Sequence, residues 1–188
     1  MRVSAAQALR RLWLAVSLCL AAALTAQGQE AVQRESAVKA AYLYRFAGFV
    51  EWPPTAQPRR PDDPLVIAVL GDDDVAADLE LVVAGRTVEG RPVATRRLRE
   101  GEPAQGVHVL LVGTMREARL REVVAAVGGP VLVVTQQEGG LWAGGVLNFS
   151  SEGGRVRFSA SLGSAAARGL KLSARLLAVA QAVEGRTP

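Results

Sequence analysis

The chain has 188 residues, of which 49% are hydrophobic and 21% charged, so it fits one globular domain and is neither a disordered chain nor a disulfide-rich miniprotein. Of its 22 Lys and Arg, three lie in residues 1–28, a segment without any acidic residue. The remaining 19 basic residues nearly balance the 18 acidic ones, which argues against nucleic acid or an anionic membrane as the partner.

The N-terminus has the pattern of a secretory signal peptide. Basic residues precede an apolar run at 12–24, and the small residues that follow predict cleavage near Ala26 or Gly28. A helix over this run would be about 20 Å long, too short for a bilayer core of about 30 Å, so we expect no membrane anchor after cleavage. Because Leu18 stands before Cys19, where lipidation needs a small residue, we expect no lipid anchor either.

Loss of residues 1–28 would leave a periplasmic protein. Cys19 is the only cysteine, so no disulfide can form in the mature chain. We expect a short N-terminal tail at 29–35, a single domain at 36–183 and a C-terminal tail at 184–188. A domain of this size buries about two thirds of its unfolded surface, so its core can stabilise it without disulfides.

The first predicted helix is strongly aromatic. Ser36–Glu51 contains no proline, can be capped by Ser36 and is followed by Pro53. This segment is apolar on nearly all sides, so it is either buried or offers one side to a partner or ligand. Together with the next residue, it holds five of the nine aromatic residues of the chain: Tyr42, Tyr44, Phe46, Phe49 and Trp52.

After a proline-rich linker, the middle of the chain alternates between strands and helices. Continuous apolar runs predict strands that are covered on both faces, and helical spacing of apolar residues predicts the helices between them. Because strand, helix and strand follow one another twice, we expect a parallel sheet with helices on its faces. The predicted strands lie at 65–70, 87–98, 107–112 and 130–135.

The C-terminal third predicts different elements. Residues 145–150 and 155–160 flank a turn with two glycines, and the alternation in the second run predicts a hairpin with one wet face. Leu162–Val183 has the apolar stripe of one long closing helix. The predicted fold is therefore an α/β layered sandwich with a mostly parallel mixed sheet, a C-terminal β-hairpin and helices on the sheet faces.

The chain is poor in catalytic groups, and no metal or cofactor is predicted. His108 is the only histidine and lies in a predicted strand, where a hydrogen bond at the sheet surface is its expected role. Asp72–Asp74 follow a strand, a place where α/β sheets often carry catalytic acids, but capping of the next helix explains them as well. A hydrolase that uses these acids is one alternative.

A glycine-rich loop carries a single tryptophan. Neither a helix nor a lysine follows Gly139–Gly145, which argues against a phosphate-binding loop. Trp142 in its middle either folds down onto the core or presents its ring to a ligand or protein.

Five stretches of the predicted domain follow one another behind the predicted signal peptide. They are 39–53 (KAAYLYRFAGFVEWP), 66–73 (VIAVLGDD), 108–112 (HVLLV), 145–149 with 155–158 (GVLNF, RVRF) and 169–177 (GLKLSARLL). In this order they resemble YfiR-like proteins. The resemblance extends from 38 to 180 and includes the first helix, two strands, the hairpin and the closing segment.

The resemblance implies a non-catalytic periplasmic regulator. Such a protein binds the periplasmic domain of a membrane-bound diguanylate cyclase, inhibits it, and so lowers cyclic di-GMP and biofilm formation. Some relatives are associated with histidine kinases, and similar folds dimerise, so a sensor kinase and a homodimer are further expected partners. This chain departs from the family in two ways: its mature part lacks the cysteines that would make repression redox-sensitive, and Ser159 and Ser161 replace an acid and an asparagine.

We expect the partner to contact aromatic and arginine side chains, which are typical of interface centres, although Phe46, Phe49 and Phe158 are equally expected in a core. The alternative function is a module that senses a small apolar or aromatic ligand, held between the first helix and the sheet and coupled to a histidine kinase. The candidate contact residues are Tyr42, Tyr44, Phe46, Phe49, Trp52, Trp142, Phe149, Arg157 and Phe158.

Overall fold

The computed structural model describes residues 35–58, 60 and 62–185. The predicted signal peptide at 1–28, nearly all of the tail that follows it and the last three residues lie outside the described part. None of the helices within that part is long and apolar enough to cross a bilayer.

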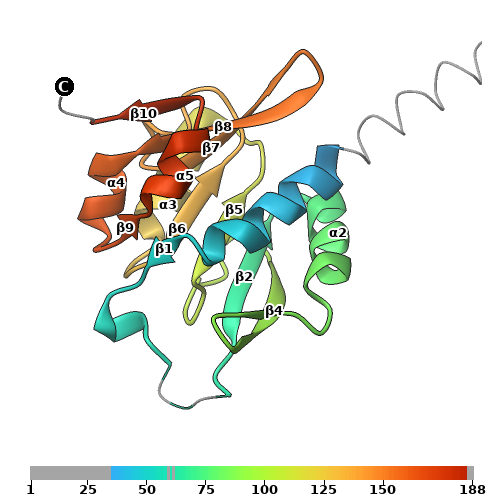
Figure 1. Cartoon of the computed structure of the whole chain (residues 1–188). Coiled ribbons are helices and arrows are strands. Elements are labelled where there is room, and N and C mark those ends of the chain that lie inside the picture. The colour runs from blue at the N-terminus through green and yellow to red at the C-terminus, as the bar shows by residue number, and fades with distance from the viewer. Residues whose placement is uncertain (1–34, 59, 61, 186–188) are drawn as a thin grey trace, which may run out of the picture. The chain divides into compact units, whose positions relative to one another are not determined.

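The described residues form a mixed sheet with the order β10-β8-β7-β6-β5-β2-β4-β3. The strands from β4 to β7 run parallel, β8 returns antiparallel to β7, and β10 lies parallel to β8 (Figure 1). The predicted α/β class and mostly parallel sheet are therefore confirmed. The strands are β2 Leu65–Leu70, β3 Thr87–Val88, β4 Arg91–Leu98, β5 Val109–Val112, β6 Leu132–Thr135, β7 Leu147–Glu152, β8 Arg155–Ser161 and β10 Ala182–Glu184.

Two hairpins have the backbone that a two-residue type I′ turn requires. Gly153 and Gly154 both have positive φ, at 57° and 72°, and Glu152 pairs with Arg155 across them. The predicted C-terminal hairpin is thus present, and Figure 1 shows its tip projecting beyond the rest of the sheet. Between β3 and β4, Glu89 and Gly90 also have positive φ.

Helices lie on both faces of the sheet. The first helix covers 35–47 and ends four residues earlier than predicted, because the chain turns at 48–49 and Val50 enters a short strand. That strand, β1, pairs antiparallel with β9 in a separate two-stranded sheet. The remaining elements are β1 Val50–Glu51, η1 Pro54–Ala56, α2 Asp73–Val83, α3 Glu117–Ala126, α4 Leu162–Ala167, β9 Lys171–Leu172 and α5 Ala174–Val179.

The single closing helix predicted at Leu162–Val183 is wrong. The chain leaves α4 at Gly169, whose φ of 69° is left-handed, and then pairs as β9 with β1. Ser173 starts a new helix, α5, because its Oγ accepts a hydrogen bond from the N–H of Leu176 at 3.2 Å. After α5 the chain becomes β10, which extends the sheet beyond β8.

The core has two layers, one on each face of the sheet. Side chains such as Ile67 and Val69 face the layer that includes the first helix and α2, and their neighbours Ala68 and Leu70 face the layer of α3. This alternation follows from the two-residue period of a strand, and it explains why β2 is an unbroken apolar run. Each fully buried Val, Ile or Leu side chain contributes about 1.5–3 kcal/mol.

Candidate functional site

The usual ligand site of an open α/β sheet is closed by backbone here. Such sites lie where the strand order reverses, which in this sheet is between the carboxyl ends of β2 and β5. At this point Gly113 N–H donates to the carbonyl of Leu70 at 2.7 Å. A Cβ at Gly113 would lie 2.6 Å from the carbonyl carbon of Gly71 and closer still to its oxygen, so the two loops pack backbone to backbone.

The three aspartates beside the contact between Gly71 and Gly113 stabilise the start of α2. Asp72 caps α2, because Oδ1 accepts a hydrogen bond from Val75 N–H at 3.0 Å, and Oδ2 accepts one from Gln136 Nε2 at 2.7 Å. Asp73 and Asp74 are exposed in the first turn of α2, where negative charge is favourable. Within the described residues, no three His, Cys, Asp or Glu side chains are grouped to hold a metal ion.

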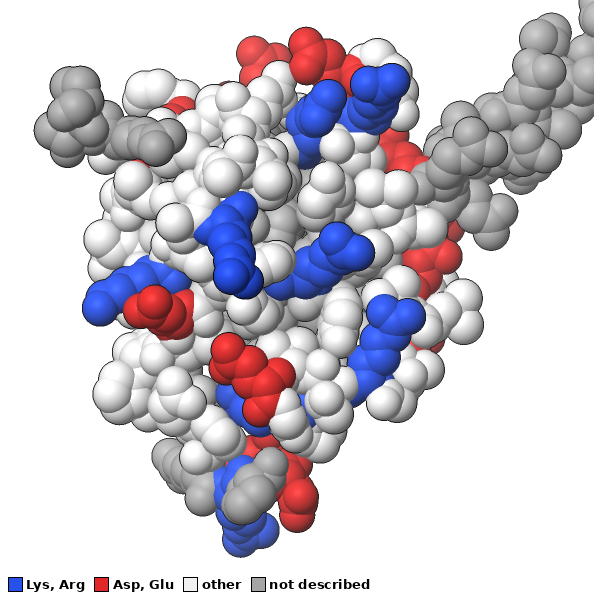
Figure 2. Space-filling model, viewed as in Figure 1, with Lys and Arg blue, Asp and Glu red and all other residues white. Residues whose placement is uncertain are grey.

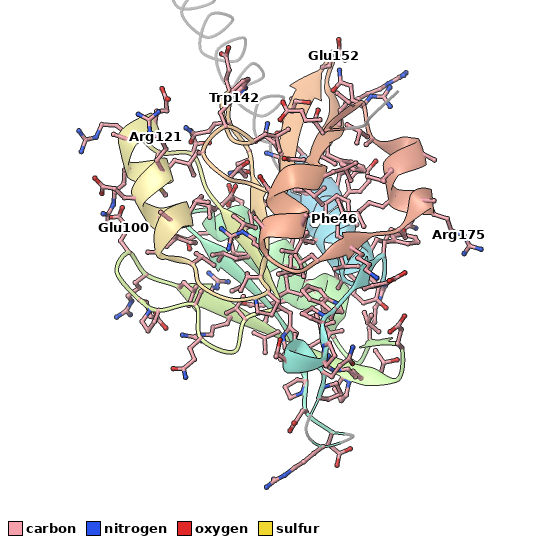
Figure 3. All side chains as sticks on the ribbon, turned by 90° about the vertical axis from the view of Figure 1, so that its left-hand side faces the viewer. Phe46, Glu100, Arg121, Trp142, Glu152 and Arg175 are labelled. Atoms are coloured by element: carbon pink, nitrogen blue, oxygen red, sulfur yellow. The ribbon has the colours of Figure 1, made fainter. Side chains whose placement is uncertain are left out.

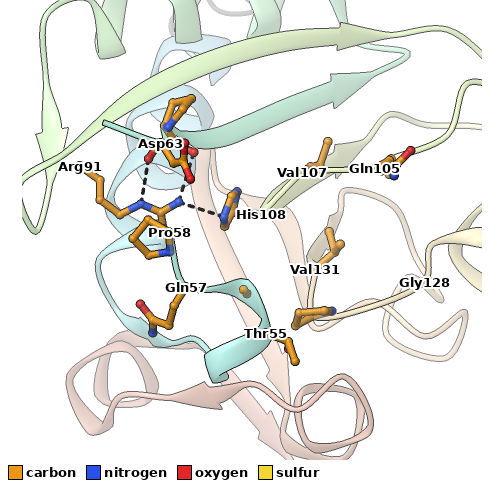
Figure 4. A pocket seen from close by; sticks show the side chains of 15 residues that line it. Thr55, Gln57, Pro58, Asp63, Arg91, Gln105, Val107, His108, Gly128 and Val131 are labelled. Carbon is orange, nitrogen blue, oxygen red and sulfur yellow. Dashed lines mark hydrogen bonds between the residues drawn. The ribbon is translucent and has the colours of Figure 1, made fainter. Parts of the chain in front are cut away.

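His108 lies at the amino end of the central strand β5, at the opposite end of the strands from the aspartates. Its Nδ1 accepts a hydrogen bond from Val66 N–H at 3.2 Å, and Arg91 Nη2 lies 3.2 Å from Nε2 (Figure 4). Burial lowers the pKa of His108 and the charge of Arg91 lowers it further, against a smaller opposing effect of a hydrogen bond with the backbone of Ala56. The imidazole is therefore neutral near pH 7, with Nδ1 as its acceptor.

A cavity of about 410 Å³ opens beside His108. Trp52 does not line it; its half-buried ring packs edge-on against His108 with the centroids 5.7 Å apart, and its Nε1 donates to the Ala47 carbonyl at 3.4 Å. Arg91 closes one side by donating to the carbonyls of Asp63 and Pro64 at 3.2 Å each. These bonds hold the proline-rich linker against the sheet.

Three predicted contact residues form the centre of the core. Phe46, Phe149 and Phe158 are only 1%, 1% and 2% exposed, and their ring centroids lie 4.9 Å to 5.7 Å apart for the pairs that involve Phe46. Tyr42 closes the cluster at its half-buried edge. These rings fill the space between the first helix and the sheet, which is where the alternative function would hold a small ligand.

Two further residues of the first aromatic group are half-buried. The Tyr44 hydroxyl donates to the Thr87 carbonyl at 2.9 Å, and the Arg86 guanidinium lies 5.5 Å from the centre of its ring. Phe49 packs against the edge of the core. Packing and a hydrogen bond therefore account for the positions of Tyr44 and Phe49.

Trp142 is different, because its side chain is 88% exposed. Of the two positions expected for it, the structure shows the presented one. Figure 3 shows Trp142 pointing outward from the loop between β6 and β7, at the same end of the molecule as Glu152 of the hairpin. Tryptophan is enriched at the energetic centres of interfaces, so an indole presented in this way is suited to contact a partner or ligand.

The loop that carries Trp142 is held by close packing and by its own hydrogen bonds. Gly140 N–H donates to the Gln137 carbonyl, Ala143 N–H to Gly139 and Gly145 N–H to Gly140, at 2.9–3.1 Å. A Cβ on Gly140 would lie 2.8 Å from Thr135 Cβ and closer still to the hydrogen-bonded Oγ1 of Thr135 and Oδ1 of Asn148. The backbone of the loop is thus fixed before binding, so ordering the loop costs little entropy when Trp142 contacts a partner.

A groove of about 490 Å³ runs beside this loop. One wall is the loop at 136–142, the floor is the polar side of the hairpin at 148–151 with Ser159, and β10 contributes Ala182 and Glu184. Arg157 pairs with Ser150 next to this floor and is exposed. Sequence reasoning found the tryptophan and the wet face of the hairpin, but missed the β10 wall because it placed that segment in a helix.

The arrangement places an exposed aromatic ring, on a loop held by hydrogen bonds and close packing, beside a polar groove. The family model described as YfiR/HmsC-like matches residues 36–181 of the chain, well over half of its length. The chain belongs to the YfiR/HmsC-like family. This family consists of periplasmic regulators without catalytic activity of their own. No curated protein matches this YfiR/HmsC-like chain.

Proposed function

We propose that this protein is exported to the periplasm and binds the periplasmic domain of an inner-membrane diguanylate cyclase, which it holds inactive. Membership of the YfiR/HmsC-like family supports this class of partner. The observation that carries the proposal is Trp142, which is 88% exposed on a loop fixed by Gly140. An exposed tryptophan on a fixed loop supplies the residue type that is most enriched at interface hot spots.

Inhibition follows from binding without any reaction on this chain. A partner domain bound to the groove and to Trp142 would be held in one conformation, and the cyclase equilibrium shifts by the difference in affinity for its inactive and active states. A hundredfold preference for the inactive state corresponds to about 2.7 kcal/mol. Loss of one tryptophan hot spot commonly removes about 2 kcal/mol or more of binding free energy, which weakens binding about thirtyfold and so lowers the fraction of cyclase that is held inactive.

The test is a cellular measurement of cyclic di-GMP with Trp142→Ala and a matched control. Leu81→Ala is the control, because Leu81 is 78% exposed on α2 and forms no part of the groove. Deleting the gene should raise cyclic di-GMP, wild type and Leu81→Ala should restore the low level, and Trp142→Ala should fail at equal protein abundance. Crosslinking with the wild-type protein in native membranes should capture a cyclase, and capture of a sensor kinase instead would replace the proposed partner.

A further inference from the structure

The outer edge of β8 has two parts, and only one of them is covered. β10 pairs with β8 at Ser159–Ser161, and Gln181 N–H donates to the Phe158 carbonyl at 2.8 Å. Within the described residues, no strand lies beyond β8 on the stretch from Arg155 to Arg157. This stretch belongs to the projecting part of the hairpin in Figure 1.

The register of the hairpin shows which backbone groups face this open edge. Ser161 N–H donates to the Val146 carbonyl, so Ser161 and every second residue before it point their backbone groups towards β7. Val156 and Phe158 alternate with these residues, so their backbone groups point away from β7, and the Phe158 carbonyl is taken by Gln181. The N–H and C=O of Val156 and the N–H of Phe158 therefore form a short template for another strand.

The side chains on this template have a defined chemistry. Arg155 and Arg157 lie on the wet face and are exposed, and none of the ion pairs within the described residues includes either of them. Val156 is on the opposite face, where it packs against the core. Glu152 lies opposite Arg155 on β7 and accepts a hydrogen bond from Gln181 Nε2 at 2.9 Å, and Figure 2 shows basic and acidic side chains on the same face of the molecule. The template therefore shows two cations separated by one apolar residue.

The charges of Arg155 and Arg157 determine which kind of strand can pair with this edge of β8. In a symmetric antiparallel pair of two copies centred on Val156, Arg155 of one copy would lie opposite Arg157 of the other. Like charges directly opposite one another destabilise a strand pair, whereas opposite charges stabilise it. A second copy is thus disfavoured on this edge, and a strand with acidic residues on either side of an apolar one is favoured.

We infer that the outer edge of β8 at Arg155–Phe158 binds an extended acidic segment of another protein by adding it to the sheet as a strand. This inference rests on the proposed function only for the identity of that protein, the cyclase partner. The acidic residues of the segment pair with Arg155 and Arg157, and its backbone bonds to Val156 and Phe158. The wet face of this strand continues into the groove beside Trp142 through Ser159, so one partner can occupy both.

A peptide experiment tests the edge directly. The probe is a synthetic peptide Gly-Glu-Val-Glu-Val-Glu-Gly, added to the isotopically labelled protein as exported by cells, with amide signals followed by NMR. We expect the Val156 and Phe158 amides to shift, with at least about tenfold weaker binding to Arg155→Glu/Arg157→Glu. A peptide with Lys in place of Glu, and one with Pro in place of Val, should leave these amides unmoved. Equal binding of the Lys peptide, shifts only elsewhere, or full binding by the double variant would overturn the inference.

Variants in cells separate this inference from the proposed function. Val156→Pro removes an N–H that faces the open side, so it should block strand addition and leave the β7–β8 bonds intact. If this variant does not fold, the double arginine variant carries the test. Loss of repression in the edge variants supports the inference. Wild-type repression in them, together with its loss in Trp142→Ala, would refute the edge and keep the proposed function. If the wild-type protein binds the peptide but does not repress the cyclase, the inference about the edge stands and the proposed function is refuted.

Discussion

Replacing Gly140 with alanine should loosen the loop that presents Trp142. The new Cβ would stand 2.8 Å from Thr135 Cβ and closer to two atoms that are hydrogen-bonded to each other at 2.7 Å, Thr135 Oγ1 and Asn148 Oδ1. Thr135 is fully buried, so it cannot move into solvent. Overpacking of a core costs about 1–3 kcal/mol, and loss of the hydrogen bond adds about 1 kcal/mol. We therefore expect a loss of about 2–4 kcal/mol.

Urea denaturation measures this loss. With a slope of about 2 kcal/mol per molar, the unfolding midpoint of Gly140→Ala should fall by about 1–2 M. Gly128→Ala is the matched control, because a Cβ there meets nothing within 4 Å and the backbone is not left-handed. It should change stability by no more than about 0.5 kcal/mol. If both variants unfold at the wild-type midpoint, tight packing does not hold the loop and our account of the fixed indole fails.

Three further predictions concern the pH response, the core and the leader. The pKa of His108 is lowered in the folded state, so the unfolded chain binds the proton more readily and stability should fall as the pH drops from about 7.5 to 5.5. His108→Asn removes the only histidine and should flatten this dependence of the urea midpoint; an unchanged slope would contradict the assignment. Phe46→Ala should lower the free energy of unfolding by about 3–5 kcal/mol, whereas a loss under 1 kcal/mol would contradict the place of this ring at the centre of the core. N-terminal sequencing of the periplasmic protein should begin at residue 27 or 29, and an intact Met1 would refute export by cleavage.

The parallel centre of the fold could be predicted from the sequence because its strands are continuous apolar runs. Leu65–Leu70 is covered on both faces, so every position is apolar and the pattern matches only a buried strand of that length. The closing segment could not be predicted in the same way. Its apolar spacing fits a helix, but tertiary pairing of β9 with β1 and of β10 with β8 overrides that spacing. Gly169 and Ser173 were the local signals of the break.

The candidate site was predictable as a set of residue types but not as a surface. The sequence identified Trp142 as the feature of a glycine-rich loop, yet composition cannot tell an indole folded onto the core from one directed outward. The course of the loop depends on tertiary contacts such as that of Gly140 with Thr135 and Asn148 from two different strands. Phe149 was a candidate contact residue, and its ring turned out to lie in the core because strand alternation directs it towards the first helix.

The close contact between Gly71 and Gly113 leaves no room for a side chain at Gly113. The loops after β2 and β5 therefore pack backbone to backbone, and we expect substitutions at Gly113 to be tolerated poorly. The proposed recognition surface comes from a later stretch, between Gln136 and Glu184, and Gln136 Nε2 donates to Asp72 beside this contact. Substitutions of exposed residues in that later stretch could therefore change which partner is bound while Gly71 and Gly113 stay unchanged.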